Sequence, residues 1–213
     1  MKNQDKPLKN FNNLLDIDQL NKEDIKYIFE YAEKLESISK GSVRKIPALR
    51  GKTILNYFAE PSTRTRVSFE NAGKILSADV INMSSSGSSD EKGESLFNSV
   101  QTLESIGANL LVIRHYDSGA PYFVSRNIDI PVINAGDGRR EHPTQALLDA
   151  LTIINRKGNI EGLKIAICGD ILHSRVARSN IYLMNMLGAE VNVIAPKTLM
   201  PRGIDNLGVK SFN

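Results

Sequence analysis

Residues 53–76 read TILNYFAEPSTRTRVSFENAGKIL, and this stretch decides the fold. The apolar run at 53–58 predicts a buried strand, and Phe69 and Ala72 begin a helical repeat. The loop at 60–66 joins the two and holds two arginines and three hydroxyl side chains. A strand, a tight loop and a helix N-terminus build an anion site, because free backbone N–H groups and the positive end of the helix dipole point the same way.

The side chains of this loop favour phosphate as the bound anion. Hydroxyls of Ser62, Thr63 and Thr65 add hydrogen-bond donors, and the guanidinium of Arg64 can fork onto phosphate oxygens. A plain capped helix with solvated arginines is the alternative, but a cap needs one hydroxyl and no arginine. We therefore expect a phosphate-binding loop.

Composition and charge narrow the class of protein. The chain has 213 residues and a net charge of +3 from scattered, nearly balanced acids and bases, which does not indicate nucleic-acid binding. No run reaches the ~18 apolar residues that cross a membrane, and residues 1–10 lack the apolar core of a signal peptide. The single cysteine, Cys168, excludes an intrachain disulfide and favours a cytoplasmic protein. Its apolar run at 165–168 predicts a buried structural thiol.

Metal and phosphoryl-transfer chemistry find little support in the motifs. The three histidines, His115, His142 and His173, have neither a cysteine pair nor an HExxH pattern around them. A phosphoryl-transfer enzyme would need a Walker loop or a metal-binding carboxylate pair, and neither stands beside the phosphate loop. We predict no metal site.

Alternating apolar strands and helices predict an α/β fold, with a mainly parallel sheet flanked by helices and an incomplete second α/β unit. Ligands in such folds bind beyond the carboxyl ends of the strands, where the polar motifs of this chain fall. We expect strands at 53–58, 80–83, 110–113, 132–134, 164–168 and 191–194. We expect helices at 22–39, 63–76, 143–156 and 175–187, and one that begins near 95.

Three ordered motifs resemble the aspartate/ornithine carbamoyltransferase family. FAEPSTRTR at 58–66, followed by SFE, is similar to the carbamoyl-phosphate loop of the family. NAGDG at 134–138 and HPTQALLD at 142–149 resemble its second signature, and GDILHSRVARSN at 169–180 resembles a third segment. The second and third motifs have the form found in the aspartate branch rather than in the ornithine branch.

The resemblance implies a reaction without a cofactor. The α-amine of L-aspartate would attack the carbonyl carbon of carbamoyl phosphate, giving N-carbamoyl-L-aspartate and phosphate in pyrimidine biosynthesis. An ornithine carbamoyltransferase and a non-catalytic homologue that binds carbamoyl phosphate remain the alternatives.

The resemblance also assigns roles to individual residues. Residues 62–65 would hold the phosphate, and Arg114 and His142 would join Thr65 in stabilising negative charge on the carbonyl oxygen. Without the resemblance, Arg114 fits a structural ion pair and His142 a polar helix cap. We predict that His142 acts as a neutral donor, because the helix N-terminus disfavours the imidazolium. The residues assigned to catalysis are Arg64, Thr65, Arg114, His142 and Gln145.

Further roles concern the rest of the two substrates. Gln145 would hold the carbamoyl amino group through its side-chain carbonyl, and Arg175 would bind an aspartate carboxylate through a bidentate guanidinium. Ser88 and Lys92 match the spacing of a family loop that reaches into the site of a neighbouring subunit. The implied assembly is a homotrimer with shared active sites, and a regulatory chain remains possible.

The resemblance divides the chain into a carbamoyl-phosphate-binding domain at 1–145, an interdomain helix at 146–158 and a partial aspartate-binding domain at 159–213. The second aspartate-recognition motif of the family, Arg-x-Gln, has no counterpart before Asn213. We therefore expect a C-terminally incomplete chain that binds carbamoyl phosphate better than it catalyses the transfer.

Overall fold

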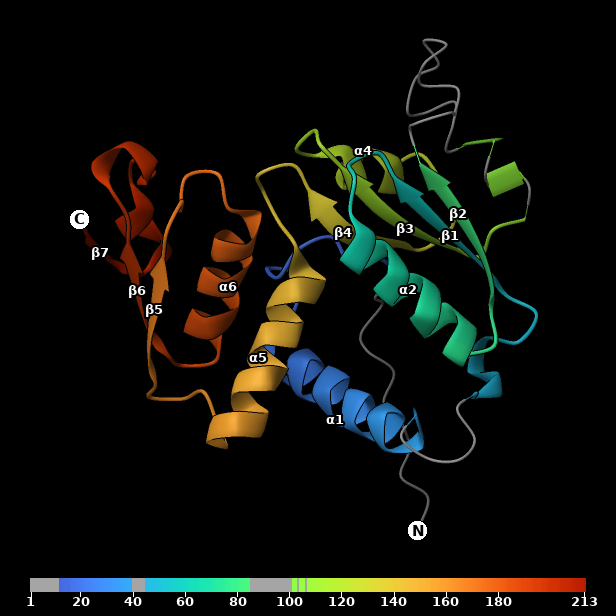
Figure 1. Cartoon of the computed structure of the whole chain (residues 1–213), viewed down its shortest axis with the longest axis horizontal. Coiled ribbons are helices and arrows are strands. Elements are labelled where there is room, and N and C mark those ends of the chain that lie inside the picture. Colours follow the sequence, from blue (N-terminus) through green and yellow to red (C-terminus); the bar gives the residue numbers. More distant parts are fainter. Residues whose placement is uncertain (1–11, 40–44, 85–100, 103, 106) are drawn as a thin grey trace.

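The computed structural model describes all residues except 1–11, 40–44, 85–100, 103 and 106, and the described part contains two parallel sheets (Figure 1). The first sheet has the order β2-β1-β3-β4 and the second the order β5-β6-β7. The strands are β1 (Thr53–Phe58), β2 (Asp79–Ser84), β3 (Leu110–His115), β4 (Val132–Asp137), β5 (Lys164–Cys168), β6 (Glu190–Ile194) and β7 (Lys210–Phe212). The α-helices are α1 (Lys22–Ser39), α2 (Thr63–Ile75), α4 (Ala120–Ser125), α5 (Pro143–Lys157) and α6 (Arg175–Met186).

Both faces of the first sheet are covered, because successive side chains of a strand point to opposite faces. Leu55 and Tyr57 of β1 pack in the core that includes Val124 of α4. Ile54 and Phe58 pack in the core on the other face, against which α2 lies. This double cover explains why β1 carries large apolar side chains on both of its faces, as buried parallel strands do.

A third core joins the second sheet to the helices between the two sheets. It contains Ile25 and Phe29 of α1, Ala146 and Ala150 of α5, and Ile181 of α6. Helix α5 crosses the space between the sheets and packs against α6 (Figure 1). The start of α5 is thereby held between the carboxyl edge of the first sheet and the start of α6.

The carboxyl ends of β1, β3 and β4 lie along one edge of the first sheet. Phe58 pairs with Arg114, and His115 pairs with Asp137 after a register shift between the strands. The loop after β1 therefore lies next to Arg114 and to the segment that leads from β4 into α5. The loop after β1, the end of β3 and the segment that follows β4 thus converge at this edge, where ligands bind in parallel sheets.

Most of the expected elements are confirmed, with a few corrections. The strand at 53–58 has the predicted bounds, but β3 and β4 run farther, so Arg114 lies within a strand rather than after it. Helix α4 and strand β7 were not predicted, and β7 gives the second sheet a third strand. The residues 95–100 that open another expected helix lie outside the described part. The predicted domain boundaries at 145 and 158 stay predictions.

The prediction of a buried thiol at Cys168 is wrong, because this residue is exposed. Strand β5 is an edge strand of the described sheet, and its exposed residues Lys164, Ala166 and Cys168 alternate with the half-buried Ile165 and Ile167. An apolar run predicts burial on both faces, whereas β5 packs only one face against the third core. In the described part of the chain, no helix combines the length and the apolar character that a membrane span requires.

Candidate active site

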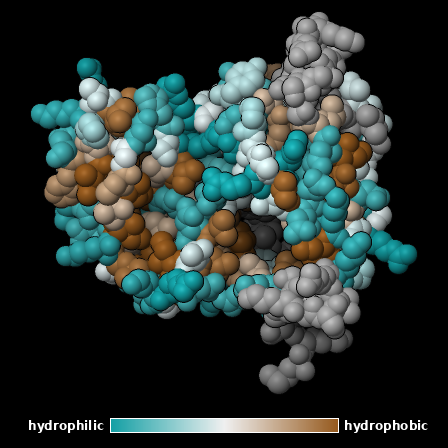
Figure 2. Space-filling model, viewed as in Figure 1, coloured by the Kyte–Doolittle hydropathy of each residue, from teal (hydrophilic) through white to brown (hydrophobic). Residues whose placement is uncertain are grey.

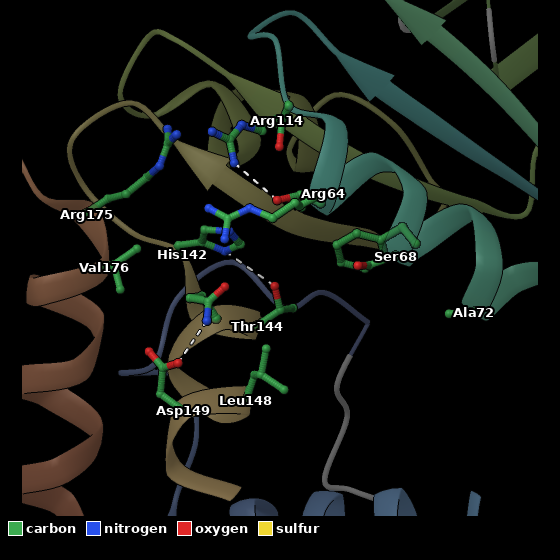
Figure 3. Close-up of a pocket in the computed structure, with 14 residues that line it drawn as sticks. Arg64, Ser68, Ala72, Arg114, His142, Thr144, Leu148, Asp149, Arg175 and Val176 are labelled. Carbon is green, nitrogen blue, oxygen red and sulfur yellow. Dashed lines mark hydrogen bonds between the residues drawn. The ribbon is translucent and has the colours of Figure 1, made fainter. Parts of the chain in front are cut away.

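A cavity of about 880 Å³ lies where the carboxyl edge of the first sheet meets α2, α5 and α6 (Figure 3). In the space-filling view the surface is hollowed between α2 and α5 (Figure 2). Seven of the residues predicted for the site line this cavity, namely Ser62, Arg64, Thr65, Arg114, His142, Gln145 and Arg175. Thr63 is exposed and is not among the lining residues, and Ser88 and Lys92 lie outside the described residues.

The α2 side of the cavity has the open donors of an anion site. Ser62 is the N-cap residue of α2, in an extended conformation, and its side chain makes no capping hydrogen bond. The hydroxyl of Ser62 thus forms no hydrogen bond with the first turn of the helix. Arg64 is exposed at the rim, and no carboxylate within the described residues forms an ion pair with it. This side therefore presents positive charge and the positive end of a helix dipole to solvent.

On the opposite side, two arginines share the carboxylate of Glu60. The Oε1 atom of Glu60 accepts hydrogen bonds from Arg114 Nη2 at 2.7 Å and from Arg175 Nη2 at 2.6 Å. Arg175 Nη1 donates to Glu60 Oε2 at 2.8 Å. Burial raises the pKa of Glu60, but the hydrogen bonds from Arg175 and Arg114 outweigh it and hold the pKa below its usual value. One carboxylate faces two guanidinium groups, so one positive charge remains uncompensated.

The segment after β4 fits closely around both arginines. Gly136 has a φ of 138°, and a Cβ atom there would lie 3.2 Å from Arg175 Cζ and 3.3 Å from Arg114 Cγ. The carbonyl oxygen of Gly138 accepts a hydrogen bond from Arg175 Nη1 at 2.8 Å. A side chain at 136 would therefore be strained and would crowd the two guanidinium stems.

His142 stands at the N-cap of α5, between the two sides of the cavity. Its side chain is buried, and its Nδ1 atom lies 3.4 Å from the hydroxyl of Thr144. Burial, followed by the positive charges of Arg114 and Arg175, lowers the pKa of His142 to about 4. The lowered pKa agrees with the neutral imidazole that we predicted, and its largest cause is burial rather than the helix dipole. A neutral imidazole can donate one hydrogen bond to an oxyanion and is a poor base.

The backbone of His142 is tied to a buried acid through Ser179. The His142 N–H donates to Ser179 Oγ at 2.8 Å, and the Ser179 hydroxyl donates to Glu141. Burial raises the pKa of Glu141 to about 7, the hydrogen bond from Ser179 opposes this, and the nearby charge of Asp16 adds to it. Sequence reasoning missed this arrangement, because Ser179 lies 38 residues from Glu141 in the chain.

Gln145 follows His142 by one turn. Its amide is held by Asp149, and Asp149 is held in turn by Asn180. The Nε2 atom of Gln145 donates to Asp149 Oδ1 at 2.8 Å, and Asn180 Nδ2 of α6 donates to Asp149 Oδ2 at 2.8 Å. Asp149 and Glu60 both belong to the quoted motifs, yet neither was assigned a role from the sequence. For Asp149 the sequence does hold one signal, because this residue follows Gln145 at the i, i+4 spacing of helical neighbours.

The remaining histidines have local partners. His115 is buried, and its Nδ1 atom accepts a hydrogen bond from the N–H of Asp117 at 3.0 Å. His173 is exposed and pairs with Asp170 at 2.9 Å. Within the residues that the structure describes, no group of three or more His, Cys, Asp or Glu side chains could hold a metal ion.

Known proteins with similar sequences point to one family. A family model described as "Aspartate/ornithine carbamoyltransferase, carbamoyl-P binding domain" matches residues 12–155. The aspartate carbamoyltransferase catalytic subunit of Pelagibacter ubique is 55% identical over 199 residues, which cover 93% of this chain and 64% of the relative. That of Syntrophotalea carbinolica is 52% identical over 204 residues, 96% of this chain and 65% of the relative. The chain thus spans slightly less than two thirds of the length of these curated relatives.

Solved structures agree on the fold. The catalytic subunit of M. jannaschii aspartate transcarbamoylase superposes with a TM-score of 0.85 at 38% identity, over 94% of this chain and 67% of that one. Aspartate transcarbamoylase from Trypanosoma cruzi, in complex with carbamoyl phosphate and aspartate, superposes with a TM-score of 0.86 at 31% identity, over 94% of this chain and 66% of that one.

Proposed function

Because this chain belongs to the aspartate/ornithine carbamoyltransferase family, we propose that it binds carbamoyl phosphate and transfers the carbamoyl group to L-aspartate. The products would be N-carbamoyl-L-aspartate and phosphate. The observation that carries the proposal is the convergence of Arg64, Arg114 and Arg175 on one cavity, where three guanidinium groups face only two carboxylates, Glu60 and Asp149. This excess of positive charge suits a ligand with a phosphate dianion and carboxylates.

The phosphate would bind on the α2 side. The hydroxyls of Ser62 and Thr65, the guanidinium of Arg64 and the N-terminus of α2 are donors on that side of the cavity. A phosphate dianion gains charge-assisted hydrogen bonds there and meets no internal carboxylate. A phosphate that leaves in the reaction is stabilised by the same groups.

The carbonyl oxygen of carbamoyl phosphate would face Arg114, Thr65 and His142. Arg114 Nη1 already lies 3.4 Å from Thr65 Oγ1, so these two donors can meet at one oxygen. His142 lines the same cavity and is neutral near pH 7. Donors placed where negative charge develops lower the barrier of acyl transfer, each by about 3–4 kcal/mol.

The transfer step forms a bond from the aspartate nitrogen to the carbonyl carbon and breaks the bond from that carbon to the bridging oxygen, which leaves with the phosphate. The nitrogen loses a proton, and the departing phosphate is a better acceptor for it than His142, whose pKa is about 4. Arg175 would hold a carboxylate of L-aspartate through its planar guanidinium. To do so, it has to loosen its contacts with Glu60.

Titration calorimetry of this chain with carbamoyl phosphate tests the proposal. We expect binding, and an affinity loss of at least about tenfold in the Arg64→Ala variant, because a charge-assisted hydrogen bond is removed. Arg156→Ala is the matched control, since this exposed arginine lies at the far end of α5. Equal affinities in the two variants, or no binding to the unmodified chain, would refute the proposal.

A second titration addresses the amine acceptor. N-(phosphonacetyl)-L-aspartate carries the phosphonate and aspartate groups on one molecule, and it should bind more tightly than carbamoyl phosphate if Arg175 receives a carboxylate. A rate assay that compares L-ornithine with L-aspartate as the amine acceptor separates the two branches of the family. The homotrimer with shared sites at Ser88 and Lys92, a regulatory chain and a cytoplasmic location stay predictions.

A further inference from the structure

The amide of Gln145 is held in one orientation by Asp149. Both residues line the cavity, and both lie on α5 one turn apart, where a dashed line reaches the Asp149 carboxylate in Figure 3. A carboxylate accepts hydrogen bonds and donates none, so it can pair only with the NH₂ end of the Gln145 amide. The carbonyl Oε1 of Gln145 is then the amide atom left for the cavity.

Asp149 is itself held from the neighbouring helix. Asn180 Nδ2 of α6 donates to its second carboxylate oxygen at 2.8 Å. The Oδ1 atom of Asn180 is buried and has no hydrogen-bond partner within the described part of the chain. Asn180 thus points its NH₂ end at Asp149 although its own carbonyl oxygen stays unpaired. The carboxylate therefore orients two amides at once, one on each helix.

We propose that Asp149 is a positioning residue that makes the site select a carbamoyl group over other acyl groups. It turns the carbonyl of Gln145 toward the substrate, where an acceptor can pair with the NH₂ of carbamoyl phosphate. An acyl phosphate with a methyl group at that place offers no N–H donor. This inference rests on the proposed function, because it requires that the cavity binds carbamoyl phosphate.

A purely structural role is the competing explanation. In that case Asp149 would only join α5 to α6, and its removal would weaken the binding of every ligand alike. The positioning role predicts a selective effect instead. The affinity for carbamoyl phosphate falls relative to acetyl phosphate, whereas inorganic phosphate, which does not reach Gln145, binds as before.

Titration calorimetry with these three phosphates tests the inference. We expect the unmodified chain to bind carbamoyl phosphate more tightly than acetyl phosphate. In Asp149→Ala this preference should fall about fivefold, which is the size of one neutral hydrogen bond. The affinity for inorganic phosphate should change by less than about twofold, because no partner of the phosphate loop is lost. An unchanged preference, or an equal loss for all three ligands, would overturn the inference.

Exchanging the residues at positions 149 and 180 should restore the orientation of Gln145. In the double variant Asp149→Asn with Asn180→Asp, the new carboxylate at 180 can only accept. The new amide at 149 must then give its NH₂ end to position 180 and its oxygen to Gln145, which restores the original orientation of Gln145. The double variant should keep the wild-type preference, and it carries the test alone if Asp149→Ala does not fold. Loss of the preference in a folded double variant would contradict the inference.

Failure of the inference and failure of the proposed function give different results. If the unmodified chain binds none of the three phosphates, the proposed function is wrong. If it binds carbamoyl phosphate and acetyl phosphate equally well, the phosphate loop works as proposed and only the role of Asp149 and Gln145 is wrong.

Discussion

The two sides of the cavity carry their positive charge in opposite ways. On the α2 side, Arg64 is exposed and has no carboxylate partner among the described residues. On the other side, Arg114 and Arg175 both donate to Glu60 at 2.6–2.8 Å. A phosphate can therefore enter the first side without displacing a carboxylate. Any anion that uses the second side has to compete with Glu60.

We expect the largest loss of stability from the substitution Glu60→Gln. Loss of the carboxylate leaves two guanidinium groups, only 12% and 14% exposed, without their shared counter-charge. Removal of one partner from a buried pair costs about 3–5 kcal/mol, and the partial exposure of Glu60 reduces this to about 2–4 kcal/mol. Urea unfolding measures the loss of stability. Added inorganic phosphate should recover more stability in the variant than in the unmodified chain, because an anion replaces the carboxylate.

The matched control is Glu70→Gln in α2. Glu70 pairs with Lys74 on the surface of the same helix, and such exposed pairs contribute little to stability because solvent screens them. If both variants lost the same small amount of stability, Glu60 would not be the counter-charge of the second side.

Two buried groups make the stability of the chain depend on pH in opposite directions. The pKa of His142 falls to about 4 in the folded chain, so His142 adds stability that is present above pH 6.5 and is lost as the pH drops toward 4. The pKa of Glu141 rises to about 7, so Glu141 adds stability that is present below pH 4.5 and is lost as the pH rises toward 7. Between pH 4.5 and 6.5 the two slopes oppose each other. We expect the stability of the unmodified chain to depend little on these two groups in that window.

Glu141→Gln removes one of the two slopes. Relative to the unmodified chain, the variant should gain about 2 kcal/mol of stability between pH 5 and pH 7, since it no longer has an acid that ionises on unfolding. Urea unfolding at the two pH values measures this difference. A difference that does not change with pH would mean that Glu141 is ionised in the folded chain throughout the range.

The first sheet and the phosphate loop could be predicted because local patterns determine them. Apolar runs bounded by polar loops fix β1, and the hydroxyls and Arg64 follow it within a few residues. The pairing of Glu60 with Arg175 could not be predicted, because it joins residues 115 positions apart. The exposure of Cys168 was missed for a related reason, since an apolar run does not tell which faces of a sheet find a cover.

The role of Gln145 shows the same limit on a smaller scale. Its place on the helix after His142 follows from the sequence, and so does the i, i+4 spacing to Asp149. The orientation of its amide does not, because it depends on Asn180 of another helix. Local motifs thus predict which groups reach the cavity, whereas tertiary contacts decide which atom each group presents.

We infer that a phosphate binds on the α2 side and leaves Glu60 with at least one of its arginines. A crystal structure of this chain with carbamoyl phosphate tests it most directly. We expect phosphate density within hydrogen-bond distance of Ser62, Thr65 and the guanidinium of Arg64. A phosphate bound elsewhere, with Arg64 still turned to solvent and the loop at 62–65 empty, would contradict it.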